Sequence, residues 1–226
     1  MAGALLLVAA VAVFAAAAAA VFRASRRDRA AKAGVLADSW GLLSGGSRVK
    51  TPAGYGALRG SFAGYPAALT PIAEALAFRR LPQLWISAAL KRDGGAGAFE
   101  IIRRPTGAEF FSGGAGLPQA VAPLPSWPQD TSVRCDEAGR ALLRELEAAL
   151  VIPLADPRVK IVAVSPGGVR VVRQAAQGAR GAYLLFRDTK FSKGGVPHEQ
   201  SLAALSLAAE IARLMSGDEI DVRDAA

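Results

Sequence analysis

The sequence predicts an α+β protein in which an N-terminal transmembrane helix precedes an antiparallel-sheet domain with two packed helices. Three observations lead to this fold class. Residues 2–22 carry no charged or polar side chain, several later segments alternate between apolar and polar residues, and two others have the amphipathic spacing of helices. The expected parts are an anchor at 1–22, a basic juxtamembrane segment and linker at 23–46, and a soluble domain at 47–226 with a sub-boundary near 112–128.

The apolar run is long enough to cross a lipid bilayer. As a helix, its 21 residues would span about 31 Å, which matches a hydrocarbon core of about 30 Å. A cleaved secretory signal is an alternative, since the alanine block at 15–20 offers small-residue cleavage patterns. Such a signal normally has Lys or Arg ahead of its apolar part, and here only the terminal amine precedes it. A buried soluble helix would show a polar face. We therefore expect a retained single-pass signal-anchor.

A cluster of positive charge follows the run directly. Cytoplasmic flanks of membrane helices carry the excess of Lys and Arg, so the short N-terminus should face outward and the domain should lie on the cytoplasmic side of an inner membrane. An envelope-facing domain is the alternative topology. The residues expected to contact anionic headgroups at the membrane surface are Arg23, Arg26, Arg27, Arg29 and Lys32.

The overall charge does not indicate a nucleic-acid-binding protein. The chain has a formal net charge of +8, with 27 basic and 19 acidic residues. Half of that excess belongs to residues 23–32, and the rest is spread thinly over the domain. A polyanion-binding surface needs a concentrated stripe of cations. We therefore expect a lipid partner at 2–22, consider a protein partner compatible with the sequence, and do not expect nucleic acid.

The first half of the domain reads as strands. A segment from about residue 57 forms two extended pieces broken near Gly64. Residues 84–104 alternate on both sides of a glycine-rich turn, which predicts a hairpin. Residues 112–128 hold four prolines and three glycines and predict a loop.

The second half mixes helices and strands. Residues 136–150 form an amphipathic helix with Asp136 as its N-cap. A hairpin follows, turning at Ser165–Gly168, and a further strand is expected around Tyr183–Phe186. The last helix, at 198–216, is apolar on most of its surface and should be deeply covered by the sheet.

No catalytic, cofactor or metal site can be assigned. His198 and Cys135 are the only imidazole and thiol, too few for a zinc centre of nitrogen and sulfur ligands. Their convergence as a catalytic pair is less favoured than a core thiol and a solvated histidine. No phosphate-binding glycine loop is present, and the S-x-x-K match at Ser47–Lys50 falls in a linker without its companion motifs.

One surface feature remains as a candidate binding site. Basic pairs bracket the predicted 84–104 hairpin and its turn, and together they could form a patch for anionic lipid or an acidic partner. The alternative is that they only protect strand ends from aggregation. The residues of this basic patch are Arg79, Arg80, Lys91, Arg92, Arg103 and Arg104.

Three segments carry a resemblance to other proteins. They are "RRLPQLW" at 79–85, "VSPGGVRVV" at 164–172 and "RGAYLLFRD" at 180–188. Behind one N-terminal span, this combination resembles bacterial single-pass membrane-anchored proteins of unknown function. The resemblance implies a bacterial, membrane-tethered protein and implies no activity or site residues.

The sequence favours a membrane-tethered interaction or scaffold domain of unknown partner. It leans against an enzyme because no catalytic constellation is visible. Two alternatives stay open. The first is a hydrolase-like or other enzyme whose site uses only Arg, Asp, Glu, Ser and Tyr, and the second is an envelope-facing binding domain.

Overall fold

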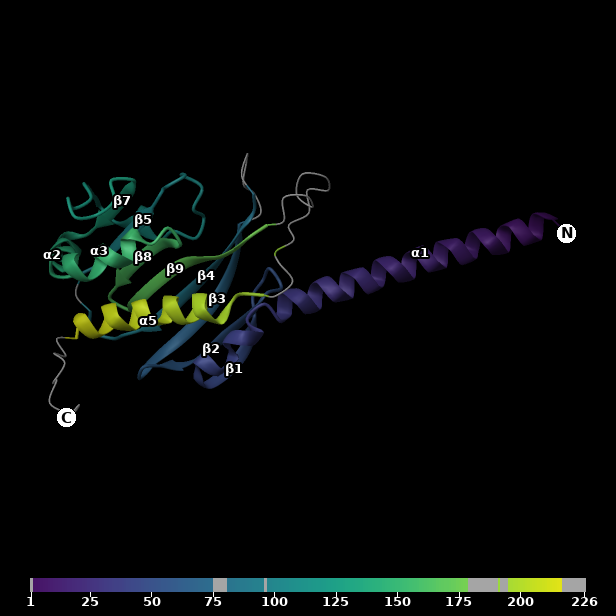
Figure 1. Cartoon of the computed structure of the whole chain (residues 1–226), viewed down its shortest axis with the longest axis horizontal. Coiled ribbons are helices and arrows are strands. Elements are labelled where there is room, and N and C mark those ends of the chain that lie inside the picture. The colour runs from purple at the N-terminus through teal and green to yellow at the C-terminus, as the bar shows by residue number, and fades with distance from the viewer. Residues whose placement is uncertain (1, 75–80, 96, 179–190, 192–194, 217–226) are drawn as a thin grey trace.

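The computed structural model of the chain describes residues 2–74, 81–95, 97–178, 191 and 195–216 (Figure 1). The predicted strand around Tyr183–Phe186 lies outside these residues. The described part confirms the predicted fold class, since a long apolar N-terminal helix precedes an antiparallel sheet with further helices.

Helix α1 (Ala2–Ala33) projects away from the rest of the protein (Figure 1). Its large apolar side chains are open to the surroundings, for example Leu6 at 72% and Phe14 at 77% exposure. Within the described chain, α1 is the one helix long and apolar enough to cross a membrane, a criterion that signal sequences also meet. Its apolar surface is therefore without a protein partner in the described part of the fold.

The second half of the predicted linker belongs to the folded domain. After α1 the chain turns, and Val35, Leu36 and Leu43 enter the hydrophobic core on either side of a short helix, η1 (Ala37–Leu42). Ser39 is fully buried, and its hydroxyl donates to the Ser201 hydroxyl at 2.7 Å. Residues 35–43 are thus part of the core, because the apolar side chains at their ends gain more from burial than from a solvated linker.

The described strands form one antiparallel sheet with the order β1-β2-β3-β4-β9-β8-β5-β7-β6. A 3-10 turn, η2 (Gly114–Gly116), precedes β6. The strands are β1 (Ser44–Lys50), β2 (Gly56–Phe62), β3 (Tyr65–Glu74), β4 (Gln83–Lys91), β5 (Phe99–Arg103), β6 (Gln119–Val121), β7 (Thr131–Cys135), β8 (Val159–Ser165) and β9 (Gly168–Gln177).

The hairpin predicted at 84–104 is wrong. The two extended segments predicted on either side of Gly64 are confirmed as β2 and β3, and the hairpin turning at Ser165–Gly168 is confirmed as β8 and β9. Strand β4 pairs with β3 and β9, and β5 pairs with β7 and β8. The β8–β9 hairpin therefore lies between the two strands that we expected to be neighbours. Strands β4 and β8 carry buried side chains on both faces, and such strands are best covered in the middle of a sheet.

Helices cover one face of the sheet, which we call the inner face. Helix α5 (His198–Leu214) packs on β4 and β9, as predicted. The helix predicted at 136–150 is in fact two, α2 (Glu137–Glu145) and α3 (Glu147–Ala155), and Asp136 caps the first by accepting a bond from the Gly139 N–H. These helices and the inner face enclose the main core, and the opposite, outer face holds a small cluster of Trp85, Ile161 and Val172.

Candidate functional site: a groove on the outer face

A row of directly paired residues crosses the outer face. Arg59 on β2 pairs with Ala68 on β3, Ala68 pairs with Ala89 on β4, and Ala89 pairs with Arg170 on β9. The row continues through β8 to Glu100 on β5. Directly paired residues point to the same side of a sheet. Two arginines therefore flank two alanines on one surface.

Glu100 ties a long connection to this surface. Its carboxylate is 3% exposed and accepts bonds from the N–H groups of Gly113 and Gly114, at 3.0 and 2.8 Å, and from the Ser112 hydroxyl. The Arg170 guanidinium also forms an ion pair with the Glu100 carboxylate, at 3.0 Å. A Cβ atom at position 114 would lie 2.5 Å from a carboxylate oxygen, so any other residue there would displace the carboxylate or the backbone that it holds. We call residues 104–117, which connect β5 to β6, the covering segment.

A second ion pair holds the other end of the covering segment. The Lys160 ammonium, itself 3% exposed, contacts the Glu109 carboxylate at 2.6 Å and donates to the backbone carbonyls of Arg103 and Arg104. Burial alone would raise the pKa of Glu109, but the bonds from Lys160 and Thr106 outweigh it and lower the pKa to about 2. Glu109 is therefore a carboxylate at all ordinary pH values.

Aromatic rings sit between these two ion pairs. Phe111 lies 6.0 Å from Trp85 on the sheet, measured between ring centroids, and Phe110 meets Phe111 edge-on at 5.2 Å. The Trp85 indole N–H donates to the Glu74 carboxylate. Phe110 is 71% exposed, which is unusual for a ring of this size on a covered face.

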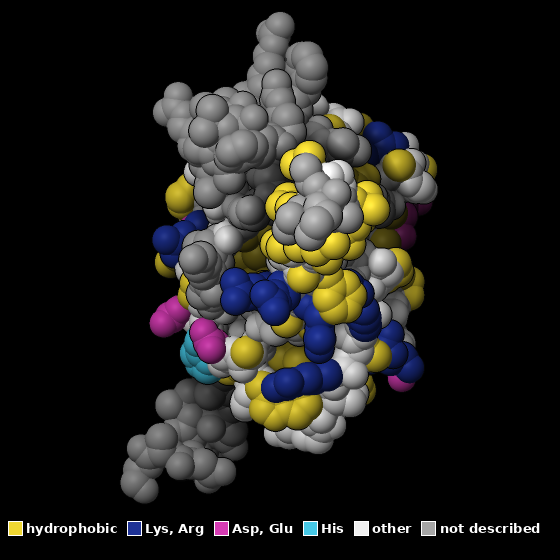
Figure 2. All heavy atoms as spheres, turned by 90° about the vertical axis from the view of Figure 1, so that its right-hand side faces the viewer, with side chains coloured by type: hydrophobic (Ala, Val, Ile, Leu, Met, Phe, Trp, Pro, Cys, Tyr) yellow, Lys and Arg dark blue, Asp and Glu magenta, His cyan; other side chains and the backbone are white. Residues whose placement is uncertain are grey.

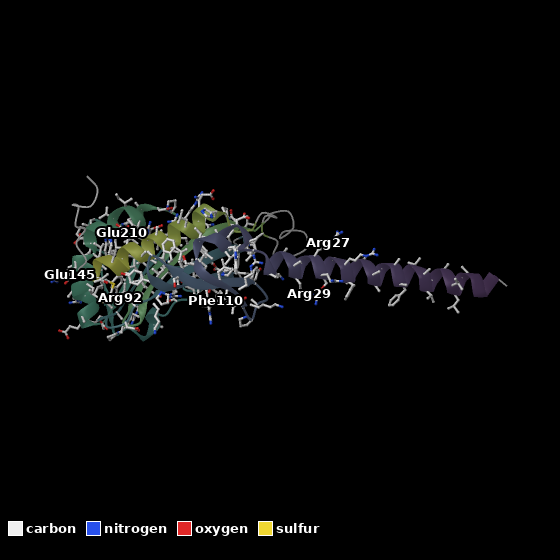
Figure 3. All side chains as sticks on the ribbon, turned by 90° about the horizontal axis from the view of Figure 1, so that it is seen from below. Arg27, Arg29, Arg92, Phe110, Glu145 and Glu210 are labelled. Atoms are coloured by element: carbon white, nitrogen blue, oxygen red, sulfur yellow. The ribbon has the colours of Figure 1, made fainter. Side chains whose placement is uncertain are left out.

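The covering segment and the sheet enclose a groove of about 820 Å³, which lies within the range of ligand pockets. Its floor includes Ala68 and Ala89, and Phe110 stands on its wall. It also reaches Lys91, at the end of β4 that lies away from α1, close to Arg92, labelled at the far end of the body in Figure 3. Phe110, which Figure 3 labels on the side of the body nearer α1, also lines the groove, so the groove extends across the outer face toward the helix.

A second hollow, of about 770 Å³, lies at the opposite end of the strands. Its lining is polar and includes Glu74, Arg104 and Asp130. The hydrogen bond from Arg103 lowers the pKa of Asp130. The first groove, with its segment held by two buried ion pairs, is the site considered below.

The predicted membrane-contacting residues all lie on α1. Figure 2, which looks toward the domain from the side of α1, shows basic side chains gathered around the base of the helix. Lys32 pairs with Asp28 at 2.9 Å, Arg29 bonds to Ser25, and Arg26 lies over the Phe22 ring. Beside the helix base, Arg48 lies 4.4 Å from the Trp40 ring. The cations are therefore grouped at the end of α1 that adjoins the domain.

The four described residues of the basic patch predicted around the 84–104 hairpin do not lie together on one surface. Lys91 and Arg92 lie at one end of the sheet, and Arg103 and Arg104 at the other, as the strand registers require. The remaining two members, Arg79 and Arg80, lie outside the described residues.

Two members of the predicted patch instead bond to helix ends. Arg103 shares the inward side of β5 with Ile101, is 5% exposed, and donates to the Leu154 carbonyl near the end of α3. Arg92 donates to the Met215 carbonyl just after α5. Cations at helix C-termini are favoured by the helix dipole. These arginines thus have structural contacts that a search for charge pairs does not reveal.

The thiol and imidazole do not converge. Cys135 is fully buried in the core, whereas the exposed His198 ring lies 3.1 Å from the Asp38 carbonyl. No group of three or more His, Cys, Asp or Glu residues that could hold a metal ion occurs in the described ranges.

Of the groove residues, the sequence analysis singled out only Lys91 as a candidate for binding. It assigned no binding role to Arg59, Glu100, Phe110 or Arg170, although Arg170 lies in the quoted segment 164–172. A local signal existed for Glu100, an acid between the apolar residues Phe99 and Ile101, because such a position must turn its charge to a face that supplies partners. The strand order brings these residues together. The predicted 84–104 hairpin paired β4 with β5 and therefore gave the wrong order.

Comparison of the chain with known protein families, with curated proteins and with solved structures finds no match.

Proposed function

We propose that the protein is a membrane-tethered interaction domain that holds a binding groove at a fixed place near a bilayer. The single observation that carries the proposal is the combination of an exposed apolar helix with a domain that begins at the helix end. Two buried residues, Val35 and Leu36, follow α1 almost directly. The groove would then be held beside the membrane without a long flexible tether.

The dimensions of α1 support this arrangement. The uncharged part, residues 2–22, has the length of a hydrocarbon core, and the remaining residues 23–33 add about 16 Å. That is enough to carry the charged turns through a headgroup layer, since a whole bilayer is about 40–45 Å thick. The basic residues of this stretch would each gain about 1 kcal/mol near an anionic surface.

An inner-membrane location with the domain in the cytoplasm is part of the proposal. It rests on the excess of Lys and Arg behind the apolar run and none before it. A bacterial origin is also proposed, and it rests on the sequence resemblance. In this orientation the groove would meet cytoplasmic proteins.

A binding role fits the groove better than a catalytic one. Glu100, the carboxylate of its lining, already accepts bonds from Ser112, Gly113, Gly114 and Arg170. General acid–base catalysis needs a carboxyl group free to exchange its proton with a substrate. The alternative function is an enzyme whose site is formed elsewhere.

The anchor is tested by alkaline carbonate extraction of membranes from cells that produce the full chain. We expect the protein to stay in the membrane pellet at full length. A matched variant, Val11→Asp with Val13→Asp, should move to the soluble fraction because two charges at the bilayer centre cost about 5 kcal/mol or more. Recovery of the wild-type domain in soluble form without its first twenty or so residues contradicts the proposal.

The orientation is tested with a reporter enzyme that is active only outside the cytoplasm, fused after Ala226. We expect no reporter activity in the wild type. A variant with Arg23, Arg26, Arg27 and Arg29 changed to Gln should show a measurable increase, because the charge bias that retains the domain is reduced. Strong activity of the wild-type fusion would instead establish an envelope-facing domain.

A further inference from the structure

The spacing of the groove's cations defines the kind of ligand it fits. Arg59 and Arg170 are three strands apart in one paired row. Since neighbouring strands are separated by about 4.8 Å, their backbones lie about 14 Å apart. An extended peptide rises about 3.3 Å per residue, so side chains four positions apart are separated by about 13 Å. The two distances match.

The surface between the arginines is small and apolar. Ala68 and Ala89 occupy the two positions between them and are only partly buried. Longer side chains at these positions would fill the groove, which instead stays open and is bordered by the exposed Phe110 ring. Such a floor suits short apolar side chains and gives a charged group nothing to bind.

The free charge at the groove is positive. Glu100 is neutralised by Arg170 and by the N–H groups of the covering segment, so it does not repel an anion. The bonds of Arg170 to Glu100 and to the Phe111 carbonyl occupy two of its five N–H donors. Arg59 is exposed, and its guanidinium has no hydrogen bond or ion pair with any residue that the structure describes, whereas its backbone belongs to the sheet.

We propose that this groove binds an extended segment of a partner protein that carries two acidic side chains about four positions apart, with small apolar residues between them. Arg59 and Arg170 bind the two carboxylates, and the alanine floor and Phe110 contact the residues between. This proposal rests on the interaction role proposed above. A nucleic acid would require a contiguous track of cations, whereas here Arg59 and Arg170 are separated by alanines and the third cation of the lining, Lys91, is paired with Asp93.

The test measures peptide binding to the full chain in nanodiscs of zwitterionic lipid by fluorescence anisotropy. The probe is a labelled peptide with two glutamates four positions apart and alanine and valine between them. One control peptide replaces both glutamates by glutamine, and another places them side by side. We expect the probe to bind at least tenfold more tightly than either control, because charge-assisted bonds at both ends contribute only in the matched spacing.

Three variants connect the binding to the groove. Arg59→Gln should weaken the probe about tenfold, and Ala68→Leu should weaken it at least as much by filling the floor. Arg140→Gln removes an exposed arginine of α2 on the other side of the sheet and should leave binding unchanged. Equal binding by wild type, Arg59→Gln and Ala68→Leu would overturn the proposal, as would tighter binding of a single-stranded oligonucleotide that displaces the probe.

Carbonate extraction of the cell membranes from which each protein is purified separates this inference from the proposed function. If the wild-type chain stays in the membrane pellet but does not bind the probe, the proposed peptide ligand is refuted and the membrane-tethered role is not. A chain that is not held in the membrane refutes the proposed function, whatever peptide it binds.

Discussion

The two faces of the sheet are held by different forces. On the inner face, apolar residues such as Ile86 and Leu205 are completely buried beneath helices. On the outer face, the covering segment is fixed mainly by the ion pairs Glu100–Arg170 and Lys160–Glu109, with a small aromatic contact between them. Apolar burial is non-directional, whereas ion pairs with backbone partners fix positions. The inner face thus supports the fold, and the outer face shapes a groove.

The largest effect should come from the inner face. Leu205→Ala removes a side chain that is fully buried in α5 and should lower the free energy of unfolding by about 4 kcal/mol. Leu202→Ala on the same helix is the matched control, because Leu202 is 38% exposed, and should cost much less. Urea unfolding of the full chain in detergent, followed by tryptophan fluorescence, measures both. Similar losses would contradict the assignment of the inner face as the main source of stability.

Breaking the Lys160–Glu109 ion pair should have the second-largest effect on stability. Lys160→Met leaves the Glu109 carboxylate without its cation and should lower the free energy of unfolding by about 3 kcal/mol, the lower end of the range for a broken buried pair, since a surface segment can move toward water. Lys91→Met breaks an exposed pair with Asp93 and should change stability by about 0.5 kcal/mol or less. Limited proteolysis provides a local measurement, in which only Lys160→Met should expose the covering segment to cleavage.

Substitution of Gly114 should have a smaller effect on stability. A Cβ atom there would press on the Glu100 carboxylate, so Gly114→Ala should cost about 1–2 kcal/mol and displace the covering segment. Gly116→Ala adds a Cβ atom with no heavy atom within 4 Å and should be nearly neutral. Near-ultraviolet circular dichroism reports the displacement through Trp85. If the two variants behave alike, Glu100 does not anchor the segment.

The smallest effect should be seen with pH. The pKa of Glu109 falls from its usual 4.5 to about 2 in the folded protein. Its stabilising contribution is therefore fully present above about pH 4.5 and is lost as the pH falls toward 2. The thermal midpoints of wild type and Glu109→Gln should differ at pH 6 and approach each other toward pH 2. A constant difference over that range would show that the Glu109 charge contributes nothing to folding.

Local patterns predicted most elements correctly, because the local sequence determines them. The capping side chain of Asp136 and the tight turn at Ser165–Gly168 are read from a few adjacent residues. The prolines of β3 also follow the rule that proline occurs where a strand has one neighbour. Pro66 pairs only with β2, and Pro71 pairs only with β4.

The groove could not be predicted in the same way. It requires Arg59 and Arg170 to lie in one row. This depends on the pairing of β9 with β4, and 76 residues separate the end of β4 at Lys91 from the start of β9 at Gly168. The glycine-rich turn after Lys91 favoured the wrong partner, β5. Strand pairing over such distances is decided by total burial of the sheet, which a single sequence does not display.

Hydrogen–deuterium exchange of the full chain in nanodiscs, with and without the two-glutamate peptide, tests most directly that the outer face binds while the inner face supports the fold. The account predicts slower exchange on peptide binding in β2, β3 and the covering segment, with α5 unchanged. Protection confined to α5 or to the α1 base, or no protection in the covering segment at saturating peptide, would contradict it.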